Sequence, residues 1–283
     1  MNQRGNKIEQ SQKILDLASK LEVPSTKKGA EVWPIISSKL TSRSKLIKLS
    51  GWMKIAASIS LVYITTYLLY QTHNVTVITS KAQQKEVVLP DRSKVLLNAE
   101  SKLHYNKLTW ALDRSLTFEG EGYFEVVEGS AFTVNSTNGT TRVLGTSFNI
   151  YARAGNYEVS CSSGRVQVDI PNRSQRVLDP GLSTSNSDES TNPIPFEKSR
   201  VLGWKKGEFY FESQPLADVL ATVERQYDVK IISQQTDLKR RYTGFFTNKD
   251  IDETLKVVCL PMGLNYELLD AKNIKIYKTK MFN

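Results

Sequence analysis

Residues 55–70 read IAASISLVYITTYLLY, sixteen residues without a charged side chain. At about 1.5 Å of rise per residue, a helix of this length covers roughly 24 Å, and the residues flanking it bring it toward the roughly 30 Å of a bilayer core. Trp52 at one end and Tyr67 and Tyr70 at the other occupy the positions of interfacial aromatic residues. The stretch predicts one transmembrane helix over residues 52–71; the alternative is a buried helix of a soluble protein.

Basic residues are distributed unequally about this stretch. Residues 35–54 contain five Lys or Arg residues and no acid, whereas residues 71–90 contain two bases. Because cytoplasmic flanks carry the excess of positive charge, we expect the N-terminus in the cytoplasm and the remaining two hundred or so residues outside it. More than fifty residues precede the span, so a cleaved signal peptide is not expected.

The charge of the chain is concentrated in its first part. The net charge is +9, but residues 1–54 hold 11 Lys and Arg against 4 Asp and Glu, while the rest of the chain holds 27 against 25. The excess therefore belongs to the predicted cytoplasmic arm, and no direct nucleic-acid partner is expected for the larger part. Cys161 and Cys259 are too few for a disulfide framework; we interpret both as buried apolar residues, with pairing as the alternative.

The arm, residues 1–50, has the pattern of short helices. Apolar residues recur at helical spacing over residues 8–22, and Pro24 ends that segment. A second apolar group surrounds Trp33. An arm of this size cannot bury these side chains alone, so we expect a partner protein or self-association to complete it; a loosely structured tail is the alternative. The apolar residues of the two groups are Ile14, Leu17, Ala18, Leu21, Val32, Trp33, Ile35, Ile36 and Leu40.

The rest of the chain predicts two units of different class. Residues 75–178 consist of short β-branched and aromatic runs separated by turn residues, which predicts an all-β sandwich or an irregular β-roll. Residues 179–200 are rich in Ser, Asn and Pro and predict a linker. Residues 201–278 alternate strands with two amphipathic helices, one beginning at Pro215 and one at Asp250. They predict a small α+β domain of two βαβ units, with both helices on one face of a sheet.

Side chains with catalytic potential are sparse. His73 and His104 have no companion at ligand spacing, so no metal site and no cofactor are expected. Glu119, Glu121 and Glu125 share strand parity, which indicates a polar face or a turn; the alternative is a carboxylate pair of an anchored hydrolase. The sequence therefore predicts a protein that is not an enzyme.

Four segments resemble the FecR family of single-span anti-sigma regulators. They read VVLPDRSKVLLNAESKLHYN (87–106), RSLTFEGEGYFEV (114–126), FTVNSTNGTTRVLGTSFNIYA (132–152) and SGRVQV (163–168). The segment WKKGEFYFESQPLADVLATVERQYDVKI (204–231) and its repeat are similar to the small domain that closes the Bacteroidota-type members. Two positions depart from the family pattern: Arg92 replaces a glycine, and Gly122 replaces an alanine. A left-handed Arg92 would cost the turn about 1 kcal/mol.

The resemblance implies partners. The cytoplasmic arm of such proteins binds an extracytoplasmic-function (ECF) sigma factor, for which we expect Trp33, Ile36, Leu17 and Leu21 to be contact residues. The outer domains, in the periplasm, receive a signal from the N-terminal domain of an outer-membrane TonB-dependent transporter; we expect Phe209, Phe211, Tyr242 and Phe245 at that contact. The span then crosses the inner membrane. A membrane-anchored periplasmic module that binds glycan or peptidoglycan is the alternative.

Overall fold

The computed structural model describes residues 13, 15–20, 33–34, 37, 50–187, 192–234 and 236–278. The chain divides into two compact units, residues 1–62 and 63–283, which are described separately. In the arm, the described residues 13, 15–19, 33, 34 and 37 are helical, as the apolar spacing of the arm predicts. The remaining residues of both predicted arm helices lie outside the described part.

Helix α3, Gly51–Thr72, covers the predicted span and extends one residue beyond it at either end. None of its side chains is buried, which contradicts the alternative of a buried core helix. Its length and composition are those of a helix that can cross a membrane. Ser58 donates its hydroxyl to the Lys54 carbonyl at 2.5 Å, so this polar group is satisfied within the helix.

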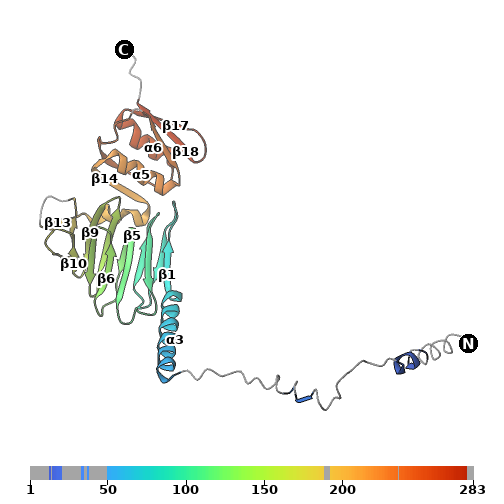
Figure 1. Ribbon diagram of the computed structural model, residues 1–283. Coiled ribbons are helices and arrows are strands. Elements are labelled where there is room, and N and C mark those ends of the chain that lie inside the picture. Colours follow the sequence, from blue (N-terminus) through green and yellow to red (C-terminus); the bar gives the residue numbers. More distant parts are fainter. Residues whose placement is uncertain are drawn as a thin grey trace, which may run out of the picture. The chain divides into compact units, whose positions relative to one another are not determined.

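Strands occupy most of residues 74–195 (Figure 1). They are β1 (Asn74–Ile78), β2 (Lys85–Val88), β3 (Lys94–Leu97), β4 (Lys102–Asn106), β5 (Arg114–Glu125), β6 (Phe132–Ser136), β7 (Gly139–Val143), β8 (Ser147–Arg153), β9 (Asn156–Ser163), β10 (Val166–Asp169), β11 (Arg176–Leu178), β12 (Leu182–Ser185) and β13 (Ile194–Pro195). This confirms the all-β class predicted for the region.

The long strand β5 belongs to two sheets. Its first half lies between β4 and β6 in the sheet β1-β4-β5-β6-β7-β10-β11, and its second half lies between β3 and β8 in the sheet β2-β3-β5-β8-β9-β12-β13. β5 and β6 are parallel, while the other pairs are antiparallel. Buried side chains of both sheets form one hydrophobic cluster, so the region is a β-sandwich joined through β5.

Two glycines allow β5 to change sheets. Gly120 has φ +116°, and a Cβ atom there would lie 2.4 Å from the Ser101 hydroxyl oxygen. A Cβ atom at Gly122 would lie 2.9 Å from the ring of Phe118. The glycine that departs from the family pattern at position 122 therefore leaves room for a fully buried aromatic side chain.

The sandwich core is rich in phenylalanine. Phe124 stacks on Phe148 with ring centroids 5.0 Å apart, and Phe118 meets Phe124 edge to face at 5.2 Å. Cys161 is buried in this core, where burial raises the pKa of its thiol to about 11. It is unbonded to Cys259, which lies in a different core, so the structure confirms the interpretation of both as buried apolar residues.

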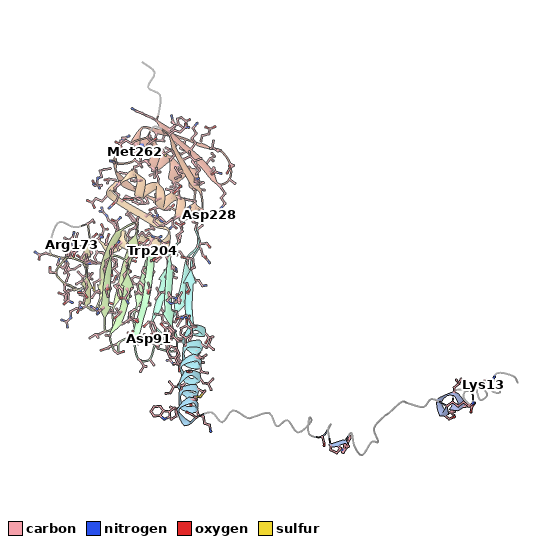
Figure 2. The ribbon with its side chains drawn as sticks, in the orientation of Figure 1. Lys13, Asp91, Arg173, Trp204, Asp228 and Met262 are labelled. Atoms are coloured by element: carbon pink, nitrogen blue, oxygen red, sulfur yellow. The ribbon has the colours of Figure 1, made fainter. Side chains whose placement is uncertain are left out.

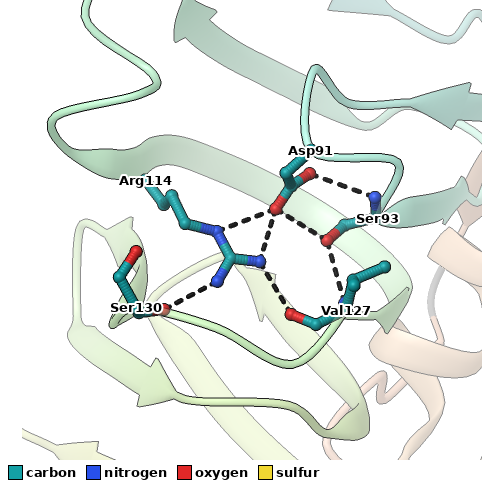
Figure 3. A network of polar contacts seen from close by, with 5 residues as sticks. All are labelled: Asp91, Ser93, Arg114, Val127 and Ser130. Atoms are coloured by element: carbon teal, nitrogen blue, oxygen red, sulfur yellow. Dashed lines mark hydrogen bonds and ion pairs between the residues drawn. The ribbon is translucent and has the colours of Figure 1, made fainter.

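The turn after β2 is fixed by a buried ion pair (Figure 3). Arg114 donates from Nε to Asp91 at 2.8 Å, and their side chains are 8% and 16% exposed. Arg114 also donates to the carbonyl oxygens of Ser130 and Val127. The neighbouring Arg92 has φ 68°, which confirms that the family glycine position is left-handed in this chain as well.

The segment expected to be a linker contributes two strands instead. In residues 179–200, β12 pairs with β9 and β13 pairs with β12. Ser183, Thr184 and Ser185 are buried although they are polar, because backbone pairing and side-chain hydrogen bonds satisfy them. Composition alone misses such a strand.

The last part of the chain contains helices and strands in alternation. Its elements are α4 (Lys198–Val201), η1 (Gly203–Lys206), β14 (Glu208–Pro215), α5 (Leu216–Tyr227), β15 (Lys230–Gln234), β16 (Arg241–Thr247), α6 (Ile251–Cys259), η2 (Leu260–Met262), β17 (Leu264–Leu268) and β18 (Asn273–Lys278). We call residues 198–278 the α+β unit. Pro215 and Asp250 are the N-caps of α5 and α6, as predicted, and the Asp250 carboxylate accepts from the Asp252 and Glu253 amides.

The strands of the α+β unit form two sheets, which corrects the expectation of one. β14 pairs with β16 antiparallel, while β15, parallel to β18, and β17, antiparallel to it, form the second sheet. Helices α5 and α6 each contact strands of both sheets. The apolar face of each helix packs against these strands. Its buried side chains, which include Leu216, Val223, Leu255 and Cys259, belong to one hydrophobic core shared by both sheets.

Candidate partner-binding surface

Strands β14 and β16 carry aromatic side chains on both faces of their sheet. The inner face holds Phe209, Phe211, Tyr242 and Phe246, which pack in the core of the α+β unit. The outer face holds Tyr210 and Phe245, which are cross-strand partners. This division follows from the period-2 alternation of a strand.

Tyr210 and Phe245 form an exposed aromatic pair. Their rings stack with centroids 5.4 Å apart and planes at 16°, and the side chains are 38% and 51% exposed. Tyr210 donates its hydroxyl to Glu208 at 3.2 Å, and Glu212 accepts from Arg200 at 2.6 Å. An apolar centre with a charged rim is the usual anatomy of a protein-binding surface. We call Glu208, Tyr210, Glu212 and Phe245 the aromatic surface.

The structure divides the four aromatic residues expected at the transporter contact. Phe209 and Tyr242 are buried, at 7% and 3% exposure, and Phe211 is half-buried. These three face the core, so they support the sheet from inside and cannot form its outer surface. Of the four, Phe245 alone is exposed, and its partner there is Tyr210, which was not among the predicted contact residues. Strand parity carries the signal, because Tyr210 lies one residue from the inward Phe209.

The same sheet offers unpaired backbone at its edges. In the described part of the chain, β14 and β16 pair only with each other, so each has one open edge. A bulge at Glu212–Ser213 interrupts β14, with Ser213 at φ 49°. An exposed edge can accept a partner strand through its backbone amides and carbonyls.

The arm residues expected to contact a sigma factor are exposed where the structure describes them. Trp33 is 68% exposed and Leu17 is 67% exposed. Leu21 and Ile36 lie outside the described residues. An exposed tryptophan in a basic arm remains available to a partner protein.

The acidic cluster does not form a paired catalytic site. Glu119 is exposed opposite Lys102, and Glu125 is exposed opposite Lys94. Glu121 instead accepts from the Asn98 amide at 2.8 Å, and burial raises the pKa of its carboxyl, while the positive charge of Arg153 opposes that shift. In the described ranges, no group of three His, Cys, Asp or Glu residues has metal-binding geometry.

His73 and His104 make local hydrogen bonds. The Nδ1 atom of His73 lies 2.7 Å from the Leu69 carbonyl oxygen, and that of His104 lies 2.8 Å from the Thr76 hydroxyl. These contacts are those of structural or surface histidines.

Residues of the family motifs hold the sandwich and the α+β unit together, and Figure 2 shows Trp204 where the two meet. The indole of Trp204 donates to Asn149 at 3.1 Å, and Gln226 donates to Asn98 at 3.1 Å; both bonds are buried. Tyr123 of β5 joins the α+β core, and the Lys205 ammonium lies 3.6 Å from the centroid of its ring. Asn98, Tyr123 and Asn149 belong to three of the four family-like segments, 87–106, 114–126 and 132–152. We call these contacts the junction.

Comparison with known proteins agrees with this architecture. The family described as "FecR protein" matches residues 75–167, and the family described as "FecR, C-terminal" matches residues 208–276. No curated protein matches the chain.

Two crystal structures of a candidate anti-sigma factor from Parabacteroides distasonis ATCC 8503, at 2.50 and 1.65 Å, are similar in fold and sequence. Their TM-scores are 0.67 and 0.66, and each is 27% identical to this chain. The match covers 73% of this chain and 100% of the solved ones. The two family matches lie in order on one side of α3, and together they span more than half of the sequence, so this chain belongs to the FecR family.

Proposed function

We propose that this protein is an inner-membrane anti-sigma regulator with α3 as its single span. The N-terminal arm binds an ECF sigma factor in the cytoplasm. The α+β unit receives a signal in the periplasm from the N-terminal domain of an outer-membrane TonB-dependent transporter. The protein needs no catalysis and no cofactor for this role. The observation that carries the proposal is the family match on both the sandwich and the α+β unit. The similarity to the Parabacteroides protein supports it.

The properties of the arm support the first half of the proposal. It is short and basic, and Trp33 is exposed to solvent. A large aromatic side chain of this kind is the commonest anchor of a protein interface. By occupying the sigma factor, such an arm would keep it from RNA polymerase until a signal arrives.

A binding titration of the full chain with the ECF sigma factors of its own organism tests the arm. We expect Trp33→Ala to weaken binding by more than about 1 kcal/mol, as the loss of an interface anchor does. Leu17→Ala is expected to weaken it as well. Leu15→Ala is the matched control, because Leu15 is as exposed as Leu17 but lies off the apolar stripe. Equal affinities of wild type and Trp33→Ala would remove Trp33 from the site, and no binding by the wild type would refute sigma capture.

The aromatic surface and the open strand edges beside it support the proposed contact with the transporter domain. A transporter domain can add a strand to the edge of β14 or β16, with its side chains resting on Tyr210 and Phe245. The paired rings provide the apolar contact, and Glu208 and Glu212 provide charged specificity at the rim.

Calorimetry with the isolated signalling domain of the transporter tests this surface. We expect Phe245→Ala to weaken binding by about 1–2 kcal/mol, and Tyr210→Ala to have a similar effect. Ile232→Ala, a substitution of a similarly exposed residue on the other sheet, is the control. A loss of binding in the control as large as in Phe245→Ala would place the contact elsewhere on the unit.

A further inference from the structure

Residues 107–112, in the connection between β4 and β5, expose two leucines to solvent. Leu108 is 47% exposed and Leu112 is 92% exposed, whereas Trp110 between them is buried. The indole ring of Trp110 packs edge to face on Tyr105 and Phe132, with centroids 5.4 and 5.7 Å apart. The buried tryptophan fixes the loop, so its two leucines are held outward by an ordered backbone.

Asn106 organises this loop and ties it to α3. Its side-chain oxygen accepts from the amides of Leu108 and Thr109 at 2.8 and 3.2 Å. Its side-chain nitrogen donates to the Tyr70 carbonyl oxygen, in the last turn of α3, at 2.8 Å. The amide of Lys107 donates to the His73 carbonyl oxygen at 2.9 Å. The loop is therefore fixed beside the C-terminal end of α3.

This position brings the two exposed leucines to the end of the proposed membrane span. If α3 spans the bilayer, Tyr70 lies among the lipid headgroups, and a loop bonded to its carbonyl lies at the same depth. Single exposed leucines are ordinary on a soluble surface, but two on one ordered loop at the end of an apolar helix are not scattered residues. Fully burying a leucine side chain contributes about 1.5–3 kcal/mol.

The chemistry around the leucines fits a phospholipid surface. Lys107 can keep its ammonium among the headgroups while its stem lies along the acyl boundary. A cavity of about 290 Å³ beside the loop is lined by Lys107, Trp110 and the Asp91–Arg114 ion pair. The exposed side chain of Lys107 lies beside Leu108, so the loop presents a positive charge next to its apolar residues.

We propose that loop 107–112 is a membrane-docking loop, which inserts Leu108 and Leu112 into the interface of the leaflet where α3 ends. The proposal rests on the membrane span of the proposed function. With α3 and the loop both engaged, the sandwich is attached to the bilayer at two points and cannot rotate freely about the helix axis.

Depth-dependent fluorescence on the full chain in phospholipid nanodiscs tests the loop. An environment-sensitive dye is attached to Leu112→Cys, to Ile59→Cys within α3, or to Leu268→Cys, an exposed site in the α+β unit. Cys161 and Cys259 are buried, and burial raises the pKa of their thiols to about 11 and about 12, so wild type should label weakly and provides the background. Lipids that carry a spin label near the headgroup or deep in the acyl chain serve as quenchers.

We expect dye emission at position 112 to shift to the blue and to be quenched most by the shallow spin label. Position 59 should be quenched most by the deep label, and position 268 by neither. Quenching at 59 without quenching at 112 would overturn the docking loop while leaving the span intact. Absence of quenching at both 59 and 112 would refute the span and the loop together, and equal quenching at 112 and 268 would overturn a specific role for the loop.

Discussion

The sandwich and the α+β unit differ in how their cores are closed. The core of the sandwich consists of side chains from its own strands and loops, from Val75 to Leu182. The core of the α+β unit includes Tyr123 of β5, and Leu96 of β3 packs against it. The sandwich is therefore complete without its neighbour, whereas the α+β unit depends on the sandwich. A unit that needs a second surface to finish its core is a suitable place for a partner to act.

Removing a ring from the sandwich core tests this dependence with the largest expected effect. Phe124 is fully buried between Phe118 and Phe148, so Phe124→Ala should lower the free energy of unfolding by about 3–5 kcal/mol. Tyr123, which is next to Phe124 in β5, is part of the core of the α+β unit. Amide hydrogen exchange should therefore become faster in both the sandwich and the α+β unit.

The matched substitution in the other core should behave differently. Leu255→Ala, also at a fully buried position, should cost about 2–5 kcal/mol but speed hydrogen exchange in the α+β unit alone. Faster exchange in the sandwich of Leu255→Ala would show that the dependence is mutual and would remove the contrast between the units.

A smaller change at the junction sharpens the comparison. Trp204→Phe keeps an aromatic ring but leaves the buried Asn149 oxygen without the indole donor, at an expected cost of about 1–3 kcal/mol. Denaturant unfolding followed by hydrogen exchange should place this loss in the α+β unit. Asn149→Ala should cost less in this background than in wild type, because the bond to Trp204 is already lost and only the bond to Glu121 remains to be removed; fully additive losses would contradict that coupling.

The smallest expected effect depends on pH at the junction. Burial raises the pKa of Glu121 above its ordinary value of 4.5, so the folded state prefers the neutral carboxyl. The stability gained from this preference is complete below the unfolded pKa and is lost as pH rises through the folded pKa. Glu121→Gln should therefore be more stable than wild type well above pH 4.5 and lose that advantage below it.

Unfolding midpoints measured across this pH range check the sign. Glu119→Gln, on the same strand but exposed, is the control and should run parallel to wild type. An advantage of Glu121→Gln that persists unchanged in acid would mean that ionisation of Glu121 does not act on the junction.

Local features of the fold could be predicted from the sequence because a few neighbouring residues determine them. The uncharged run predicts α3, and Asp250 predicts the start of α6. Arg92 adopts the left-handed backbone conformation of the glycine that it replaces in the family pattern. Strand β12 was missed because its Ser-Thr-Ser segment gains stability from pairing with β9, not from its own apolar content.

Long-range features could not be predicted in the same way. The strands of the α+β unit form two sheets because β14 pairs with β16 and β15 pairs with β18, and both partners lie far along the chain. At the candidate site, aromatic composition identified the strands that carry the exposed aromatic pair, but residue type does not show which face a side chain occupies. Strand parity places Tyr210 and Phe209 on opposite faces of the sheet, but the packing of the helices decides which face is buried.

One residue, His73, separates the end of α3 from the start of β1. β1 pairs with β4 along its whole length, from Asn74 opposite Asn106 to Ile78 opposite Lys102. A protease that cuts just outside the membrane would need an unpaired, extended stretch of chain, and none is spared here. Cleavage at this point would first require β1 to separate from β4 by local unfolding. The hydrogen bonds of this one strand pair would therefore protect the chain from proteolysis.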